Sequence, residues 1–317
     1  MLFGTVSTIT LAFAIATPAN STSGNNCALP GNPSGVTCTV SGGLQISSGQ
    51  SFTNSGTANN PNFEIFVSSG TFNNEGTVNN SAAFSFAGGT FINTGTFNHL
   101  AGNFSLAPGN VSSAGTFNNA STIIFRNSTF VNTGIFNNSG SLAVGISMIG
   151  PASGTFLNSG TFSNTGAIGD GSGGPFNFEN QAGGTFNAGG TIIVNGFVNA
   201  GTVVVAGNGG AITTQALTGN YVQTPTGKIS VRADWTGNSG AGTADKLTIT
   251  GTAELAGTVV VNPLNFPTTC GLTKQFTVLT ADGGITNNGI SIANTAAVNY
   301  ALLFTPASVT SVEVADR

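Results

Sequence analysis

The residues that could carry out acid–base chemistry are few and scattered in this sequence. A serine hydrolase needs a base beside its nucleophile, and the one histidine of the chain is His99. His99 ends the phrase Phe-Asn-His, where other copies of the phrase end in Asn, so its place in a repeat accounts for it. Glu64 and Glu75 are single carboxylates that we expect on different sides of the fold, which leaves no acid–base pair. The sequence therefore predicts that the protein is not an enzyme.

Cysteine and aspartate offer two further kinds of site. Cys27 and Cys38 enclose two prolines and two glycines, and a pair this close in an exported chain predicts a local disulfide worth about 3 kcal/mol. Metal binding is the rival interpretation, but no His, Asp or Glu lies nearby to complete a site. Asp170, alone among glycines, resembles a calcium loop only weakly, because calcium binds about six to eight oxygens, and a plain turn is expected. Cys270 is left over, which predicts a buried or loop thiol, with an intermolecular bridge as the alternative. We expect neither a metal nor another cofactor.

These scattered residues lie within or beside a repeat that organises most of the chain. Its clearest copy, at 69–80, is SGTFNNEGTVNN: an apolar residue, any residue and Asn, then a small residue, Gly-Thr and a second apolar-x-Asn. The first apolar position recurs at 52, 72, 91, 111 and 130. A period of about 20 residues is typical of a solenoid. A third apolar patch has the same period, with inward positions such as Phe84 and Phe86, and Phe66 is placed with it because it precedes Phe86 by one full period.

Each repeat thus offers three short runs in which apolar and polar residues alternate, and no helical period occurs. A single turn cannot bury its own Phe, so turns must stack, each strand pairing with the same strand of the next turn. The sequence predicts an all-β, right-handed parallel β-helix, with about 20 residues and three short strands per turn. The residues predicted to form its core include Phe52, Phe72, Phe91, Phe117, Phe136 and Phe156.

The Asn that follows each core residue by two positions also points inward, at the place where the strand bends. Asn tolerates the left-handed conformation of a turn, and its amide can donate to one neighbouring turn and accept from the other. An exposed glycan-binding array is the alternative, but regular spacing beside a core Phe favours a structural ladder. The first predicted ladder comprises Asn54, Asn74, Asn93, Asn132 and Asn158. The second comprises Asn60, Asn80, Asn119, Asn138 and Asn164, with His99 in place of an Asn.

Composition and charge change along the chain. Only 5% of the residues are charged, the net charge is −4, and the Lys and Arg form no cluster, so the sequence predicts no nucleic-acid partner. Residues 1–20 contain an apolar run followed by small residues, which predicts a secretory signal peptide; the alternative is a first strand of the fold. We expect an N-terminal cap with the Cys pair at 21–43 and Asn/Phe-rich repeats at 44–215, with a loop inserted near 140–154. A C-terminal unit at 216–317 holds most of the charges.

Residues 217–317 resemble the C-terminal part of a pertactin-like autotransporter passenger domain, a class exported by type V secretion. The phrases that carry the resemblance are LTGNYVQTPTGKISVRADW, ADKLTITGTAELAGTVVV, FTVLTADGGITNNG and AAVNYALLFTPASVTSVEV, in this order. The resemblance implies that this region closes the β-helix and templates its folding, as an autochaperone. It also implies a Gram-negative bacterium, a location at the cell surface, in the outer membrane or secreted, and an outer-membrane β-barrel translocator as partner. That translocator is expected but absent from this chain, which would make the chain a passenger fragment, a processed form or the product of a truncated gene.

These observations lead to one expected function and two alternatives. An exported β-helix with extended neutral faces predicts a non-enzymatic adhesin or self-associating stalk, which binds its own copies, host or environmental glycans or matrix through many weak contacts. The first alternative, a polysaccharide-acting β-helix enzyme, lacks clustered acids and bases. The second is an ice-binding solenoid, because Thr follows Gly repeatedly; these Thr are single and irregularly stepped, which argues against a flat two-column array. The Thr residues concerned are Thr71, Thr90, Thr116, Thr155 and Thr185.

Overall fold

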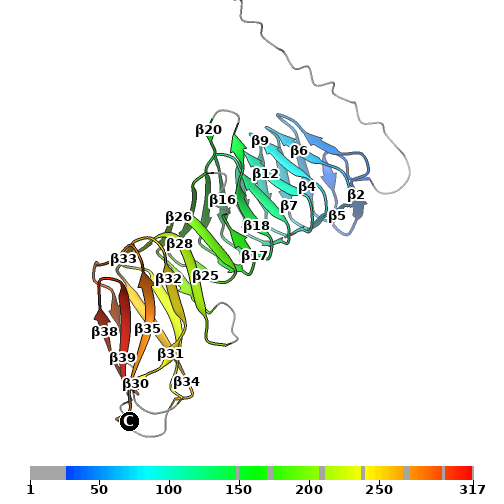
Figure 1. Cartoon of the computed structure of the whole chain (residues 1–317). Coiled ribbons are helices and arrows are strands. Elements are labelled where there is room, and N and C mark those ends of the chain that lie inside the picture. The colour runs from blue at the N-terminus through cyan, green and yellow to red at the C-terminus, as the bar shows by residue number, and fades with distance from the viewer. Residues whose placement is uncertain are drawn as a thin grey trace, which may run out of the picture.

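The computed structural model describes residues 26–147, 150–169, 174–206, 211–236, 240–266, 271–294 and 297–315. Throughout these residues the regular structure consists of strands, without a helix. The strands stack as successive coils of an elongated column, which ends in β38 (Val298–Phe304) and β39 (Ser308–Ala315) (Figure 1). The predicted all-β parallel β-helix with three strands per coil is therefore confirmed. The segment 1–20, Asp170 and Cys270, which the sequence singled out, lie outside the described residues.

Each coil contributes one short strand to each of three parallel faces, which we call faces A, B and C. The chain passes through B, then A, then C in each coil. Face A comprises β2 (Thr37–Thr39), β5 (Thr57–Asn60), β8 (Thr77–Asn80), β11 (Thr96–His99), β14 (Thr116–Asn119), β17 (Ile135–Asn138), β22 (Thr161–Asn164), β25 (Thr185–Asn187), β27 (Thr202–Val204), β29 (Lys228–Asp234), β34 (Thr258–Leu264) and β37 (Ser291–Ile292). Face B comprises β1 (Gly31–Asn32), β4 (Ser51–Asn54), β7 (Thr71–Asn74), β10 (Thr90–Asn93), β13 (Asn110–Ser113), β16 (Ser128–Asn132), β21 (Gly154–Asn158), β24 (Phe176–Asn180), β33 (Ala253–Leu255) and β36 (Ile285–Asn287).

Face C comprises β3 (Leu44–Ile46), β6 (Ile65–Ser68), β9 (Phe84–Ala87), β12 (Asn103–Ala107), β15 (Thr122–Phe125), β18 (Ser141–Val144), β23 (Ala167–Ile168), β32 (Lys246–Ile249) and β35 (Thr273–Ala281). Two longer strands, β26 (Thr191–Asn199) and β28 (Thr214–Gln223), run across faces C and B together. Faces B and C therefore join towards the C-terminus, whereas face A stays separate along the column.

Neighbouring coils stack in register. Phe91 of β10 pairs with Phe72 of β7, and His99 of β11 pairs with Asn80 of β8. Towards the C-terminus the coils lengthen, so that Asn220 accepts a hydrogen bond from Thr252, 32 residues later. The stack continues across this change, because β27 pairs with β29 and β26 with β28. The fold is thus one continuous stack of coils whose length per coil varies.

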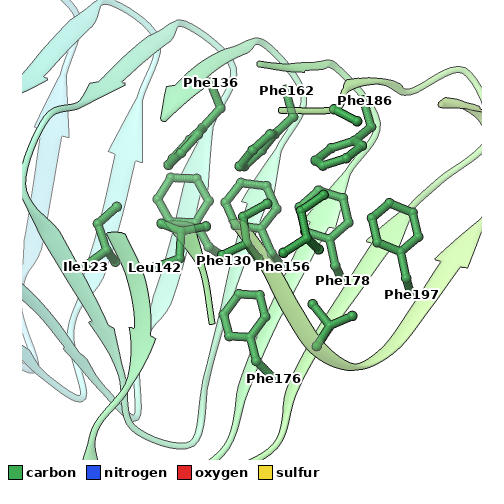
Figure 2. Close-up of a cluster of buried hydrophobic side chains, with 14 of the residues drawn as sticks. Ile123, Phe130, Phe136, Leu142, Phe156, Phe162, Phe176, Phe178, Phe186 and Phe197 are labelled. Carbon is green, nitrogen blue, oxygen red and sulfur yellow. The ribbon is translucent and has the colours of Figure 1, made fainter. Parts of the chain in front are cut away.

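Alternation along each strand places the Phe of the repeat inside the column, where faces A and B each build a stack of rings (Figure 2). On face B the ring centroids of Phe130 and Phe156 are 5.0 Å apart, and those of Phe136 and Phe162 on face A are 4.9 Å apart. Phe136 and Phe156 meet edge to face between the two stacks. Burying one such side chain contributes about 1.5–3 kcal/mol. The predicted core positions Phe52, Phe72, Phe91, Phe117, Phe136 and Phe156 are all buried.

The placement of Phe66 among the inward residues is wrong. Val67 of β6 is the buried residue that pairs with Phe86 of β9, whereas Phe66 pairs with Ser85 and is only half-buried. The step between these coils on face C is one residue shorter than the sequence comparison assumed. A shift of one residue moves a side chain to the opposite side of a strand, so Phe66 lies on the outer side.

Glycine is required where the chain turns from face B to face A. At Gly95 an added Cβ would lie 2.1 Å from the carbonyl oxygen of Gly76, one coil earlier. At Gly115 an added Cβ would lie 2.1 Å from the carbonyl oxygen of Gly95. This distance is far shorter than any van der Waals contact. The backbones of successive coils therefore touch along this corner, which explains the Gly of the repeated Gly-Thr phrase.

Short antiparallel elements interrupt or end the parallel stack. At the corner between β18 and β21, where the sequence predicts an inserted loop, β19 (Ile146–Ser147) and β20 (Gly150–Pro151) form a two-stranded hairpin. Near the C-terminus β31 (Thr243–Ala244) pairs antiparallel with β29, whereas β30 (Gly240–Ala241) pairs parallel with β35. β39 then runs antiparallel to both β35 and β38. This reversal of strand direction marks the C-terminal end of the described column (Figure 1).

Candidate functional site

A column of buried amides runs along the inner side of face B. Asn54 Nδ2 donates to Asn74 Oδ1 at 2.8 Å, and Asn74 Nδ2 donates to Asn93 Oδ1 at 2.7 Å. Further along, Asn132 Nδ2 donates to Asn158 Oδ1 at 2.8 Å. Each of these amides also donates to a backbone carbonyl of the next coil. Because the side chains are buried, the column joins the coils and offers nothing to a ligand.

This column is longer than the sequence analysis indicated. Asn32 precedes it, and Asn180, Asn199 and Gln223 continue it, each hydrogen-bonded to its neighbour. The sequence carried a signal for two of these residues, since Asn180 and Asn199 follow core Phe residues by two positions.

One coil of the column lacks an amide. Ser113 occupies the position, and its Oγ accepts a hydrogen bond from Asn93 Nδ2 at 3.0 Å. Asn132 Oδ1 of the following coil is buried and has no hydrogen-bond partner. The break is a consequence of side-chain length, because a hydroxyl is shorter than a carboxamide and carries a single proton.

His99 belongs to the second inner column, on face A, together with Asn60, Asn80, Asn119, Asn138 and Asn164. Asn80 Nδ2 lies 3.2 Å from His99 Nδ1, and His99 Nε2 lies 3.3 Å from Thr122 O. Burial lowers the pKa of His99 to about 4, so the ring is neutral near pH 7. A buried, neutral imidazole bonded on both nitrogens cannot reach a substrate. The ring therefore serves as a column member, as its place in the repeat predicts.

The described carboxylates do not assemble into a catalytic or metal site. Glu75 accepts a hydrogen bond from Ser55 Oγ at 2.8 Å at the corner between β7 and β8, and Glu64 lies on the stretch before β6. Among the residues that the structure describes, no three His, Cys, Asp or Glu side chains come together as a metal site. Two surface hollows occur at the corner between faces C and B, and their linings contain no titratable side chain. One is lined by Gly88, Pro108, Gly109, Asn110, Asn127, Ser128 and Thr129, and the other by Val144, Gly169, Gly174, Pro175, Phe176, Ile193, Val194 and Asn195.

Two covalent or charged features lie at the ends of the column. Cys27 and Cys38 form a disulfide at the first coil, with their Cα atoms 5.0 Å apart. At the other end Glu313 of β39 is fully buried and accepts a hydrogen bond from Ser311 Oγ at 3.1 Å. Burial raises the pKa of Glu313 to about 7, although the hydrogen bond from Ser311 opposes the shift. Lys274, the cross-strand neighbour of Glu313 on β35, is also buried, and its Nζ donates to Thr236 O at 2.9 Å.

The outer side of face A carries two further columns, which we call together the Thr/Asn face. Asn98 Nδ2 donates to Asn79 Oδ1 and Asn118 Nδ2 donates to Asn98 Oδ1, both at 2.8 Å. Except before Asn137, a Thr stands two residues before each Asn of the column, on the same side of the strand. The Thr column comprises Thr57, Thr77, Thr96, Thr116, Thr161, Thr185 and Thr202, with Ile135 in the one intervening coil. The Asn column comprises Asn59, Asn79, Asn98, Asn118, Asn137 and Asn187, with Ser163 between the last two.

The Thr residues singled out from the sequence do not form one column. Thr71, Thr90 and Thr155 lie on face B, whereas Thr116 and Thr185 lie on face A. Their irregular steps arose because two faces were combined. The irregular spacing that argued against a two-column array therefore does not apply to face A, where Thr-x-Asn recurs in register from coil to coil. The signal was present in the sequence, in the Asn that directly precedes most members of the inner column of face A, as Asn79 precedes Asn80 and Asn118 precedes Asn119.

The Thr/Asn face is uncharged, and neither of the two surface hollows described above lies on it. Its Thr and Asn side chains are half-buried, apart from the exposed Asn137, and no outward residue of face A from Thr57 to Val204 is charged. On the same coils Glu179 lies on face B, and Arg126 lies just after face C ends at Phe125.

Comparison of the chain with protein-family models and with curated proteins gives no match. Across the described part of the chain, no helix has the length and apolar character needed to span a membrane.

Proposed function

We propose that this chain is a non-enzymatic adhesin or self-associating stalk, and that the Thr/Asn face is its binding surface. The observation that carries the proposal is the repetition of one uncharged pair of side chains, Thr and Asn, at the same outward positions of successive coils. Asn79, Asn98 and Asn118 each use one donor and one acceptor within the column and keep further hydrogen-bonding capacity for a partner.

Binding on such a surface is distributed over many coils. A single Thr or Asn contributes a weak contact, but contacts on one rigid column are made together, and their combined affinity greatly exceeds that of each alone. The partners that suit an uncharged surface of donors and acceptors are glycans, matrix or other copies of the chain. Ionic partners are disfavoured, because the face offers no charge for them to pair with.

The setting of the proposed function is the exterior of a Gram-negative cell. The disulfide between Cys27 and Cys38 supports it, because disulfides persist in exported proteins. The resemblance of residues 217–317 to autotransporter passengers supports export by the same route, with an outer-membrane translocator as partner. An enzymatic function has no comparable support, since His99 is buried and the two hollows lack acids and bases.

The proposal is tested by displaying the chain on cells that do not otherwise clump or attach to a surface. Lysine at Asn79, Asn98 and Asn118 together places three like charges on the Thr/Asn face and should abolish clumping and attachment. The matched control places lysine at Asn73, Ile92 and Ser112. These are outward residues of face B on the same three coils as Asn79, Asn98 and Asn118. The control should clump like the unchanged chain, provided that circular dichroism shows both variants folded.

A second variant separates adhesion from catalysis. His99→Asn restores the residue that other coils have at this position and should leave clumping unchanged. Loss of clumping from this single change, in a protein that still folds, would contradict the adhesin proposal and favour an enzyme. The reason is that an enzyme concentrates its effect in a few residues. Equal clumping by the two lysine variants would contradict the assignment to face A.

A further inference from the structure

The polar atoms of the Thr/Asn face form a fixed two-dimensional array. Within a column, successive side chains are separated by the spacing of adjacent strands, roughly 4.8 Å. Between the columns, Thr and Asn are two residues apart on one strand, roughly 6.6 Å. The pairings of face A from β5 to β27 keep one register.

The side chains of this array have little freedom to move. Thr is branched at Cβ, which restricts its first side-chain torsion. The Asn amides are held by hydrogen bonds along their column, for example Asn118 to Asn98 and Asn137 to Asn118, each at 2.8 Å. A ligand that binds here meets groups already in position, so little ordering entropy is lost on the protein side. Hydrogen-bonded side-chain ladders of this kind also favour a sheet with little twist.

Three features define the ligand that such an array fits. The face has no charge, so the ligand is neutral. Neither of the two described hollows lies on this face, so the ligand is an extended surface rather than a single sugar or peptide side chain. Each hydroxyl both donates and accepts, and so does each amide, at regular intervals in two directions. The ligand must therefore present donors and acceptors as a lattice.

We propose that the Thr/Asn face binds ice. Every water molecule at an ice surface donates and accepts hydrogen bonds, and the molecules are fixed in a regular neutral lattice. Bound waters can bridge the hydroxyls and amides of the face to that lattice with nearly the strength of direct hydrogen bonds. The Thr methyl groups between the polar atoms offer no hydrogen bond, so water on this face bonds to the hydroxyls, the amides and other water molecules. This inference rests on the proposed function, because it names a ligand for the same adhesive surface.

The other two faces lack this regularity. The outward residues of face B include Ile92, Val131, Leu157 and the charged Glu179. Those of face C include Phe66 and other apolar residues. Within the two columns of face A the one apolar residue is Ile135, whereas apolar or charged groups recur at uneven positions on faces B and C and interrupt an ordered layer of water. Ice binding is therefore assigned to face A alone.

The test uses the purified full chain and two measurements, the inhibition of ice recrystallisation and thermal hysteresis. The unchanged chain should slow recrystallisation and separate the melting and freezing points. Thr116→Tyr, in the middle of the Thr column, should reduce both effects at least several-fold, because a ring standing above the array keeps neighbouring coils away from the lattice. Thr77→Tyr repeats the test two coils away.

The matched control is Thr129→Tyr, an outward residue of β16 on face B in the coil next to β14. It should retain full ice activity and the same thermal unfolding midpoint as Thr116→Tyr. An unchanged chain without ice activity would overturn the inference, and so would equal activity of the Thr116 and Thr129 variants. The proposed adhesin function is tested separately, by measuring the clumping of cells that display the chain above the freezing point. Cells that clump while the protein lacks ice activity would overturn the ice assignment alone, and ice activity without clumping or attachment would overturn only the broader adhesin.

Discussion

Asn132 Nδ2 lies 2.8 Å from Asn158 Oδ1, although the two residues are 26 positions apart in the sequence. Other neighbours in the same column, such as Asn74 and Asn93, are 19 positions apart. The hairpin of β19 and β20 takes up the extra residues at a corner, outside the column. The ladder is therefore maintained by the stacking of coils and tolerates insertions at the corners between strands.

The inner column should be sensitive to a single change of atom type. Asn93→Asp replaces an amide that donates to Ser113 Oγ and to Thr116 O with a second oxygen, which faces these acceptors in a buried site. We expect a loss of about 3 kcal/mol in the free energy of unfolding at pH 7, because a buried carboxylate loses its hydration and its second oxygen faces the carbonyl oxygen of Thr116, which cannot donate. Thermal and urea unfolding measure the loss. Asn73→Asp, on the outer side of β7, is the control, and equal effects of the two changes would show that Asn93 is not enclosed.

The break in the ladder at Ser113 should be repairable. Ser113→Asn supplies an amide whose oxygen can accept from Asn93 and whose nitrogen can donate to the unpartnered Asn132 Oδ1. We expect the free energy of unfolding to rise by about 1 kcal/mol, the usual net value of one hydrogen bond. Urea unfolding of the variant and of the outward control Ser112→Asn gives the comparison. A destabilised Ser113→Asn would mean that this coil is too narrow for a carboxamide.

The corner between faces B and A should not accept a methyl group. Gly115→Ala places Cβ 2.1 Å from the carbonyl oxygen of Gly95, and the coils must separate to relieve the contact. We expect destabilisation of about 2 kcal/mol or more, as overpacking of a tight interior causes. Gly42→Ala is the matched control, because an added Cβ there meets no atom within 4 Å. Similar unfolding midpoints for the two variants would contradict the close approach of the coils.

The C-terminal end of the column should lose stability as the pH rises. The pKa of Glu313 is raised from 4.5 to about 7 in the folded chain, so between these values the folded state holds a proton that the unfolded state has released. Stability from this group is therefore complete below pH 4.5 and is lost as the pH rises through 7, by on the order of 3 kcal/mol. Glu313→Gln should remove this dependence and be more stable than the unchanged chain at pH 8. Unfolding curves from pH 4 to pH 8 would show it, and a parallel fall in both proteins would assign the effect to other groups.

The fold, the core and most of the inner columns could be predicted because their residues recur at nearly constant steps. His99 could be placed in its column for the same reason, since position in the repeat fixes which way a side chain points. Phe66 was misplaced because the step from coil to coil varies by one residue, and one residue reverses the direction of a side chain. Ser113 could not be recognised as a ladder position from its residue type.

Two features of the candidate site and the C-terminal end were beyond the sequence pattern. The Thr/Asn face was missed because Thr follows Gly on two faces, and only the pairing of strands separates Thr116 from Thr90. The burial of Glu313 was not predicted because carboxylates are ordinarily exposed. Its burial depends on the antiparallel return of β39 along β35, a pairing between segments that share no repeat.

Each amide column carries a net electric dipole along its length. In the inner columns each Asn donates towards the C-terminal end, as Asn54 does to Asn74 and Asn60 to Asn80. In the outer column of face A each Asn donates towards the N-terminal end, as Asn98 does to Asn79. Aligned amide dipoles add, as they do along a helix, so the inner and outer columns of face A carry opposed dipoles that offset one another. Face B has an inner column alone, and along that side of the molecule the positive end of the summed dipole points towards the C-terminal coils.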